Sequence, residues 1–353
     1  MRCSAEVAVA PRDLPERPMN NAMSEVQRLP ASAEAAAVTG VRRTLDRAAH
    51  VWMDLDAPAA ARRRTSGSTS TVASLSSVAG VVRSGDEEIQ MKRPSIFLAE
   101  RTDPEVAEYL TIGHTVIVPV GATEQHGAHD PLGTDSFIAT AVSERLARRL
   151  GGLVAPTLPY GVSSEHRGFK GVSYVTAATL AAVIQDVCRS LAEVGFRRII
   201  LLNGHGSNLP ALAPTARELQ DDLPEGTMVI PLTYTDGLKP EEAARYIGPE
   251  VGFHANIGET SAVLAIDESL VDMSKAAAHL PDFPMDEWVA AWGVFWNSAP
   301  DLIIRITPTG TWGDPTGSTK ELGETFLQQI EDSCVKLLGD VERLNERFPR
   351  RQN

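Results

Sequence analysis

The feature that most constrains the fold is a regular alternation, from about residue 95 onward, between short apolar runs and longer amphipathic patterns. The apolar runs resemble buried strands, at 115–120, 153–157, 198–202, 227–234 and, as a last candidate, 301–307. The longer patterns repeat apolar residues at helical spacing, at 136–150, 177–196, 209–223, 259–271 and 318–338. Such alternation is typical of a mainly parallel sheet with helices on both faces. The sequence therefore predicts a single-domain α/β fold, with ligands bound beyond the carboxyl ends of the strands.

Residues 1–90 differ from the rest of the chain. They are rich in Ala, Arg, Ser and Pro and include the polar run "RRRTSGSTSTVASLSSVAG". Such a segment buries too little apolar surface to offset the entropy lost on ordering. Two interpretations stay open: a disordered N-terminal extension, or a translated leader upstream of a true start at Met91. In both, the folded domain is expected to span residues 91–345.

The charge of the chain narrows the class of partner. The net charge is −13, and it falls entirely on residues 91–353, because residues 1–90 contain as many Arg as acidic residues. An acidic body argues against nucleic acid and anionic membranes and is ordinary for an enzyme of small molecules. The three cysteines lack the spacing of a zinc or redox motif, which favours a reducing, cytoplasmic compartment.

Metal-type ligands cluster where the strands are expected to end. In "VGATEQHGAHDPLGTD", which follows the strand 115–120, Glu124 and His126 are two residues apart and share one face of an extended chain. Asp135 stands at the entrance to the next helix, and His205 follows the strand 198–202 in "NGHGSN". Carboxylates and imidazoles suit Zn, Mn or Fe, and an aspartate is well suited to bridging two ions. These residues therefore predict a metal site.

Structural alternatives remain open for several of these positions. Asp135 could cap its helix, and Asn208 is expected to cap the helix 209–223. Glu165 and His166, in "PYGVSSEHRGFKGVSY", fit a solvated loop as well as a substrate contact. Glu259 could simply compensate a helix dipole near a helix start expected at Thr260 and Ser261.

A second group of motifs adds a candidate for proton transfer. His254, in "GFHANIGETS", lies outside any apolar pattern, which favours an acid–base role.

Together with "GTWGDPTGST", the four motifs quoted above resemble the creatininase family, in the family's order and over about residues 95–335. The resemblance implies a single-domain α/β fold, a binuclear metal centre and, commonly, a hexamer. It also implies that His254 is a catalytic acid or base and that the metal ligands are Glu124, His126, Asp135 as the bridge, and His205.

Three departures from the family pattern bear on the site and the substrate. Creatinine-cleaving members carry a ligand glutamate where this chain has Ser207, so Glu259 is expected to act as the fifth ligand and to share in catalysis. The loop before His254 lacks their tryptophan, and "FKGVS" replaces a proline-bearing sequence and brings Lys170 near the pocket. Both changes argue against creatinine as substrate. The pocket is expected to be lined by His129, Glu165, His166, Lys170 and Ser173.

Three functions follow from the resemblance and the residues. The first is hydrolysis of a C–N bond, in an amide or cyclic amide of a small polar metabolite, by water activated between two divalent ions. The second is hydrolysis of a C–C bond that opens a cyclic ketone derived from a polyol. The third, motivated by Ser207, is a metal-binding assembly protein that has lost activity.

Overall fold

The structure is a computed structural model that describes residues 95–281, 294–296 and 298–349, all within the compact unit Glu87–Asn353. The predicted extension 1–90 and the alternative start at Met91 lie outside the described residues. In the part of the chain that the structure describes, no helix combines the length and the apolar character needed to cross a membrane.

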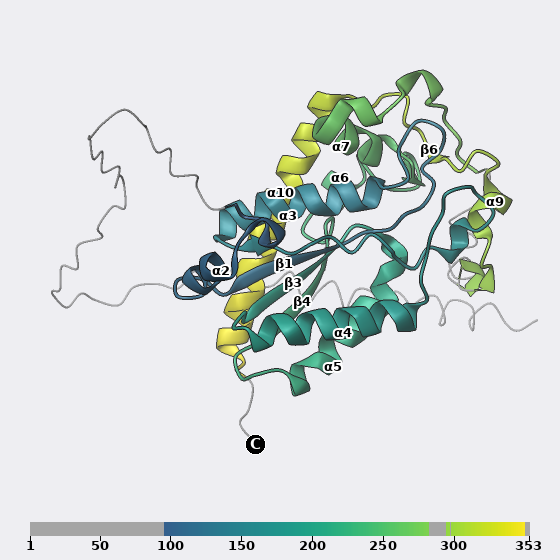
Figure 1. The fold of residues 1–353 in the computed structure, drawn as a ribbon. Coiled ribbons are helices and arrows are strands. Elements are labelled where there is room, and N and C mark those ends of the chain that lie inside the picture. Colours follow the sequence, from purple (N-terminus) through teal and green to yellow (C-terminus); the bar gives the residue numbers. More distant parts are fainter. Residues whose placement is uncertain (1–94, 282–293, 297, 350–353) are drawn as a thin grey trace, which may run out of the picture. The chain divides into compact units, whose positions relative to one another are not determined.

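A four-stranded parallel sheet forms the centre of the molecule (Figure 1). Its strands are β1 (Thr115–Val120), β2 (Leu153–Val154), β3 (Arg198–Asn203) and β4 (Met228–Thr233), in the order β2-β1-β3-β4. Their side chains are largely buried on both faces, as expected for strands covered by helices on each side. Val120 pairs with Asn203 across β1 and β3, so these strands end at the same edge of the sheet. The predicted mainly parallel α/β fold is confirmed.

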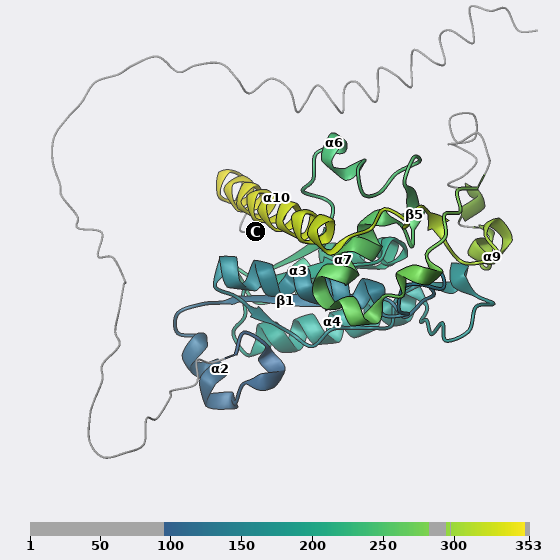
Figure 2. The same ribbon diagram turned by 90° about the horizontal axis from the view of Figure 1, so that it is seen from above.

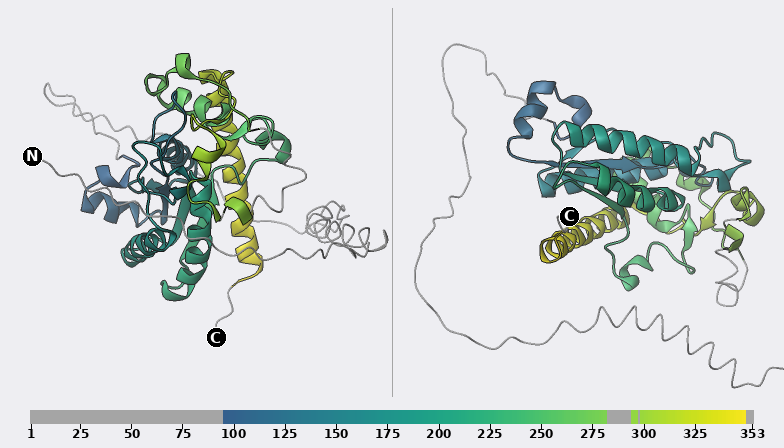
Figure 3. Two further views of the ribbon diagram at one scale, coloured as in Figure 1. Left: turned by 90° about the vertical axis from the view of Figure 1, so that its right-hand side faces the viewer. Right: turned by 90° about the horizontal axis from the view of Figure 1, so that it is seen from below.

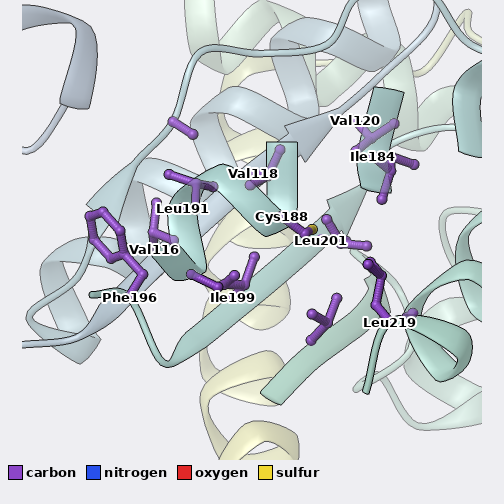
Figure 4. Close-up of a cluster of buried hydrophobic side chains, with 14 of the residues drawn as sticks. Val116, Val118, Val120, Ile184, Cys188, Leu191, Phe196, Ile199, Leu201 and Leu219 are labelled. Atoms are coloured by element: carbon purple, nitrogen blue, oxygen red, sulfur yellow. The ribbon is translucent and has the colours of Figure 1, made fainter. Parts of the chain in front are cut away.

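Two helices cover one face of the sheet. They are α4 (Ala177–Glu193) and α5 (Leu209–Asp222), which lie side by side when the sheet is viewed from below (Figure 3). Ile184 and Cys188 of α4 and Leu219 of α5 meet Val116, Val118, Ile199 and Leu201 of the sheet in one buried apolar cluster (Figure 4). The amphipathic spacing of both segments therefore serves this core.

Three helices cover the opposite face: α3 (Thr134–Leu150), α7 (Ile257–Asp267) and α10 (Lys320–Arg347). Seen from above, α10 runs alongside α3 and α7 (Figure 2). Ile138, Val142 and Leu146 of α3 pack with Val263, Phe326 and Ile330 in a second buried cluster. Other short helices include α2 (Asp103–Tyr109), α6 (Pro240–Ala243), and the 3-10 turns Leu98–Glu100, Ser164–His166, Gly206–Asn208, Glu268–Leu270 and Met273–Lys275.

The helix starts resolve the capping alternatives. Asp135 lies inside the first turn of α3, and Gly133 is the N-cap residue, so Asp135 is not the cap. Asn208 precedes α5 but caps no helix with its side chain; its Oδ1 accepts from the Val162 N–H and its amide donates to the Gly121 carbonyl. Asn208 therefore occupies the predicted N-cap position, but its side chain makes no capping bond, because its amide ties together the loops that follow β1 and β2.

The last predicted strand, 301–307, is wrong. Residues Leu302–Ile306 form the short helix α9, which packs against the 3-10 turn Ser164–His166. A short apolar run does not by itself distinguish a strand from a buried helical turn. Next to α9, β6 (Trp312–Gly313) pairs antiparallel with β5 (Gly252–His254) in a separate two-stranded sheet.

Candidate metal centre

Four side chains from the ends of β1 and β3 and the start of α3 converge in a buried cluster. His126 Nε2 lies 3.3 Å from Asp135 Oδ1, and His205 Nδ1 lies 3.4 Å from Asp135 Oδ2. The same His205 nitrogen is 3.3 Å from Glu124 Oε1. All four residues are buried, and the two carboxylate oxygens of Asp135 face different histidines. The predicted convergence of these side chains at one edge of the sheet is thus present in the structure.

Two further residues reach the cluster from β5 and α7. Donor atoms of His126, Asp135 and Glu259 lie within 4.8 Å of one another, as do those of Glu124, Asp135 and His205. Donor atoms of His254 lie equally close to those of Glu124 and His126. Asp135 therefore belongs to two donor groups, which is the arrangement that a bridging carboxylate requires.

A tight turn between β5 and α7 fixes the Glu259 carboxylate. Ala255 has a φ of 52°, which is uncommon for a residue with a side chain, and its N–H donates to Glu259 Oε2 at 2.7 Å. Asn256 caps α7 by accepting from the Gly258 and Glu259 N–H groups, so the helix begins earlier than Thr260. Glu259 lies in the first turn, where the helix dipole also favours its charge.

The buried ionisable groups of the cluster shift one another's pKa values. Burial raises the pKa of Glu124 and of Glu259, each to about 7. Burial disfavours a charge on His126 as well, but Asp135, through its charge and a hydrogen bond, and the charges of Glu259 and Glu124 together outweigh burial and raise the His126 pKa to about 10. Burial, together with the charge of His126, holds the His254 pKa well below its usual value. Three carboxylates thus share one buried space and need positive charge to remain ionised.

The residues fit a pair of divalent ions. Several of their buried atoms, namely both oxygens of Glu124, His126 Nε2 and Asp135 Oδ2, make no hydrogen bond. An unpaired buried polar atom is costly, and a metal ion is a partner that satisfies several such atoms at once. Carboxylate oxygen with imidazole nitrogen is the donor chemistry of Zn, Mn and Fe sites. Geometry and donor type therefore agree with the predicted site.

Two of the predicted pocket residues line the cavity beside this cluster. Glu165 and His166 lie in the 3-10 turn Ser164–His166, and both are buried. His166 Nε2 is 3.2 Å from Glu124 Oε1. The Ser207 hydroxyl donates to Glu165 Oε1, which is 3.4 Å from His205 Nε2. Glu165 therefore sits behind His205, on the side of the ring away from Asp135.

The other three predicted pocket residues are not part of the cavity wall. Lys170 and Ser173 are exposed and do not line the cavity, and the glycines on either side of Lys170, Gly168 and Gly171, both have positive φ. His129 is buried elsewhere, and burial lowers its pKa to about 4. Its Nε2 lies 3.0 Å from Thr260 Oγ1. The structure thus places the His129 ring against the start of α7 and outside the cavity wall.

Sequence reasoning missed the apolar wall of the cavity. The cavity has a volume of about 1010 Å³, and its far side includes Phe253, Trp296 and Trp312. The ring of Trp312 lies edge-on to Phe253, with centroids 5.3 Å apart, and 6.2 Å from that of Trp296. The loop before His254 lacks a tryptophan, and Trp296 and Trp312 are distant from that loop in the sequence, so no local pattern predicts that they reach the cavity.

The comparisons with known proteins agree with this geometry. The family model described as creatinine amidohydrolase, Creatininase, matches residues 99–338. The chain belongs to the creatininase family. A creatinine amidohydrolase of Pseudomonas putida is 34% identical over 272 residues, which cover 72% of this chain and 98% of the relative.

Other relatives are named for different substrates. A mycofactocin precursor peptide peptidase of Mycobacterium ulcerans (strain Agy99) is 31% identical, covering 63% of this chain and 83% of its own. A 3-dehydro-scyllo-inosose hydrolase of Thermotoga maritima is 28% identical, covering 73% and 87%. These relatives are all hydrolases, so membership supports a hydrolase without deciding the bond.

Solved structures carry the same fold and name two metals. A creatininase structure described with Mn is 30% identical, with a TM-score of 0.57, and covers 72% of this chain and 100% of its own. A Zn-Zn form of a creatininase mutant is also 30% identical, with a TM-score of 0.56, and covers 72% and 99%. The creatininase-like fold expected from the sequence is confirmed.

Proposed function

We propose that this creatininase-family chain is a two-metal hydrolase that cleaves a C–N bond, in an amide or cyclic amide other than creatinine. The observation that carries the proposal is the position of Asp135, whose two oxygens face separate groups of buried donors. One group, with Glu124 and His205, would hold the first ion. The other, with His126 and Glu259, would hold the second, so that Glu259 takes the place that Ser207 leaves vacant in the ligand set.

The ions and the protein have separate tasks in this reaction. When bound, a pair of divalent ions lowers the pKa of water toward about 7 and polarises the carbonyl group under attack. His254 handles the proton. Its Nε2 lies 2.6 Å from the Gln125 carbonyl oxygen, which can only accept, so Nε2 carries the proton of the neutral ring and Nδ1 is unprotonated. Nδ1 can therefore take a proton from the attacking water and pass it to the departing amine. Nδ1 also faces the cluster, 3.7 Å from Glu124 Oε1.

The shape of the cavity favours a substrate with an apolar part. Its volume of about 1010 Å³ lies at the upper end of the roughly 300–1,000 Å³ of ordinary small-molecule sites. The aromatic side chains Phe253, Trp296 and Trp312 face the same space as the carboxylate cluster. An amide that carries a ring or another flat apolar group would bury that group here and place its C–N bond at the metal centre.

A second candidate is hydrolysis of a C–C bond in a cyclic polyol-derived ketone. It is favoured by the 3-dehydro-scyllo-inosose hydrolase relative and by the polar side of the cavity, where Ser164, Ser207 and Thr233 offer hydroxyl groups. We rank it second, because hydroxyl-rich substrates gain little from an aromatic wall. A hexamer of this chain and a cytoplasmic location stay predictions from the resemblance and the composition.

Metal analysis combined with product analysis tests the proposal. We expect about two ions per chain, because Asp135 belongs to two donor groups. We also expect the enzyme to release an amine from members of a panel of amides. Asp135→Ala should lose both ions and lower kcat/KM on the order of 10³-fold or more. Asp186→Ala, at an exposed position on α4, is the matched control and should change neither.

Each alternative has a distinct outcome. A metal-free wild-type protein that is fully active would refute the proposal. A carboxylate product without amine would support the C–C reaction. Bound metal and intact assembly without turnover of either class would support the inactive protein, the third possibility.

A further inference from the structure

One buried side-chain amide lies between His166 and His254, beside the candidate centre, and has no role in the function proposed above. Gln125 stands between Glu124 and His126 in the sequence, and its side chain is almost completely buried, with the residue 4% exposed. Its Nε2 lies 3.0 Å from His166 Nδ1 and 3.1 Å from the Gly310 carbonyl oxygen. Its Oε1 accepts from the Gly127 N–H at 2.9 Å.

These contacts fix the orientation of the amide. The Gly310 carbonyl can only accept a hydrogen bond and the Gly127 N–H can only donate one. Exchanging the oxygen and nitrogen of Gln125 would therefore set two acceptors against each other and two donors against each other. One amide hydrogen is consequently committed to Gly310, and the second points to His166 Nδ1, which must accept it. The proton of neutral His166 then resides on Nε2, 3.2 Å from Glu124 Oε1.

The backbone of the same residue fixes the other histidine. The Gln125 carbonyl oxygen lies 2.6 Å from His254 Nε2, so this nitrogen must carry a proton in order to donate. Because both amide hydrogens are committed elsewhere, the 3.2 Å separation between Gln125 Nε2 and His254 Nε2 is a contact between two donors. The side chain anchors the backbone that offers this carbonyl, since its amide bonds to Gly127 and Gly310 on either side.

We propose that Gln125 is a positioning residue that sets which ring nitrogen carries the proton in both His166 and His254. It leaves His254 Nδ1 open toward the centre and directs the Nε2–H of His166 toward Glu124. The inference rests on hydrogen-bond geometry alone, and only its catalytic consequence rests on the proposed function. Gly310, which is distant from Gln125 in the sequence, lies directly against its amide. Gly310 has a φ of +86°, and a Cβ at this position would overlap the Gln125 amide.

Nitrogen-15 NMR of histidine-labelled, zinc-loaded, full-length protein tests the proton positions directly. His166→Asn and His254→Asn variants identify the two rings by loss of their signals. In the wild type we expect both rings to be protonated at Nε2 and unprotonated at Nδ1. A wild-type His166 protonated at Nδ1 would overturn the inference, whatever the variants do and whether or not any amide is hydrolysed.

The isosteric variant Gln125→Glu asks whether the amide causes the pattern. A carboxylate cannot donate to His166 Nδ1, so the His166 proton should move to Nδ1 and kcat should fall by about 10- to 100-fold, with a smaller change in KM. Gln125→Met, which offers neither donor nor acceptor of comparable strength, should give a mixture of the two His166 forms. An unchanged His166 signal in both variants would overturn the causal part of the inference.

A glutamine on the far side of the sheet provides the control for loss of an amide. Gln220 of α5 donates through Nε2 to the Ala216 and Val229 carbonyls, so it makes a comparable pair of bonds. Gln220→Glu should lower the free energy of unfolding while leaving the histidine signals and kcat unchanged. A change of the His166 signal in this variant as well would show that loss of an unrelated, partly buried amide also disturbs the ring, and would count against a specific role for Gln125.

Discussion

The two faces of the sheet are both packed with apolar side chains, but their helices differ in what they bring to the site. On the α4–α5 face the helices bury aliphatic groups, and neither of them buries a carboxylate. On the opposite face, α3 and α7 each bury one in the first turn, Asp135 and Glu259. Two similarly packed cores therefore differ in function: the helices of one face support the sheet, and those of the other also hold the carboxylates of the candidate centre.

The direction of the chain after each strand explains this difference. The chain leaving β1 turns through Gly127 into α3, and α3 and α7 pack on each other with their first turns near the same strand ends. The chain leaving β3 places His205 in the connecting loop and then enters α5 on the other face. The α5 side thus contributes through its loop, before the helix begins. Substitutions on each face can test this difference.

The largest effect in this series is expected for a carboxylate of the α7 helix. Glu259→Gln keeps the size and the Ala255 N–H contact but removes the charge, so the second ion should be lost and kcat/KM should fall on the order of 10²–10³-fold. Metal content should drop from about two ions to about one per chain, as measured by elemental analysis. Glu218→Gln, exposed on α5, is the control. If Glu259→Gln retained both ions, Glu259 would not be the fifth ligand, and another residue would have to fill that role.

Next in size is a matched pair of core truncations, one on each face. Ile138 of α3 and Ile184 of α4 are both fully buried, so replacing either with Ala should lower the free energy of unfolding by about 2–5 kcal/mol in urea denaturation. Only Ile138→Ala should also weaken zinc binding in a competition titration, because Ile138 lies one turn after Asp135 on the same helix. Equal loss of zinc affinity in both variants would abolish the distinction between the faces.

A smaller effect is expected at the aromatic wall, which belongs to neither face. Trp312→Leu keeps the position apolar but removes the flat ring, so the preference for an aryl-bearing amide over its methyl counterpart should fall roughly 10-fold in kcat/KM. The rate for the methyl amide serves as the internal control and should change little. A preference that survives the substitution would place the apolar group of the substrate elsewhere in the cavity.

The smallest effect is expected at Ser207, in the loop that leads to α5. Ser207→Ala removes the hydroxyl that donates to Glu165, and a change within about 10-fold in KM is expected from loss of one hydrogen bond to a charged group. Both ions should remain, because the serine hydroxyl is directed to Glu165 and Glu259 supplies a donor beside Asp135. Loss of an ion on this substitution would make Ser207 a ligand and weaken the case for Glu259.

Local spacing in the sequence was sufficient for much of the fold and for the centre's first four residues. Fully apolar runs alternating with amphipathic ones predicted the parallel sheet, because strands buried on both faces need helices on each side. The sequence also predicted that four side chains lie close together, because parallel strands end at one edge of a sheet: Glu124, His126, Asp135 and His205. The error at 301–307 arose where a short apolar run fits a helical turn as well as a strand.

The tertiary structure alone decided which distant segments meet at that edge. It places Glu259 beside His126 and Asp135 and the Ser207 hydroxyl against Glu165. It also leaves Lys170 exposed, outside the cavity wall. Trp312 reaches the cavity through the pairing of β6 with β5. Local periodicity determines how a segment presents its own side chains. The distance between two segments depends on turns such as Ala255 and on the packing of α7 against α3, which are settled only when the whole core assembles.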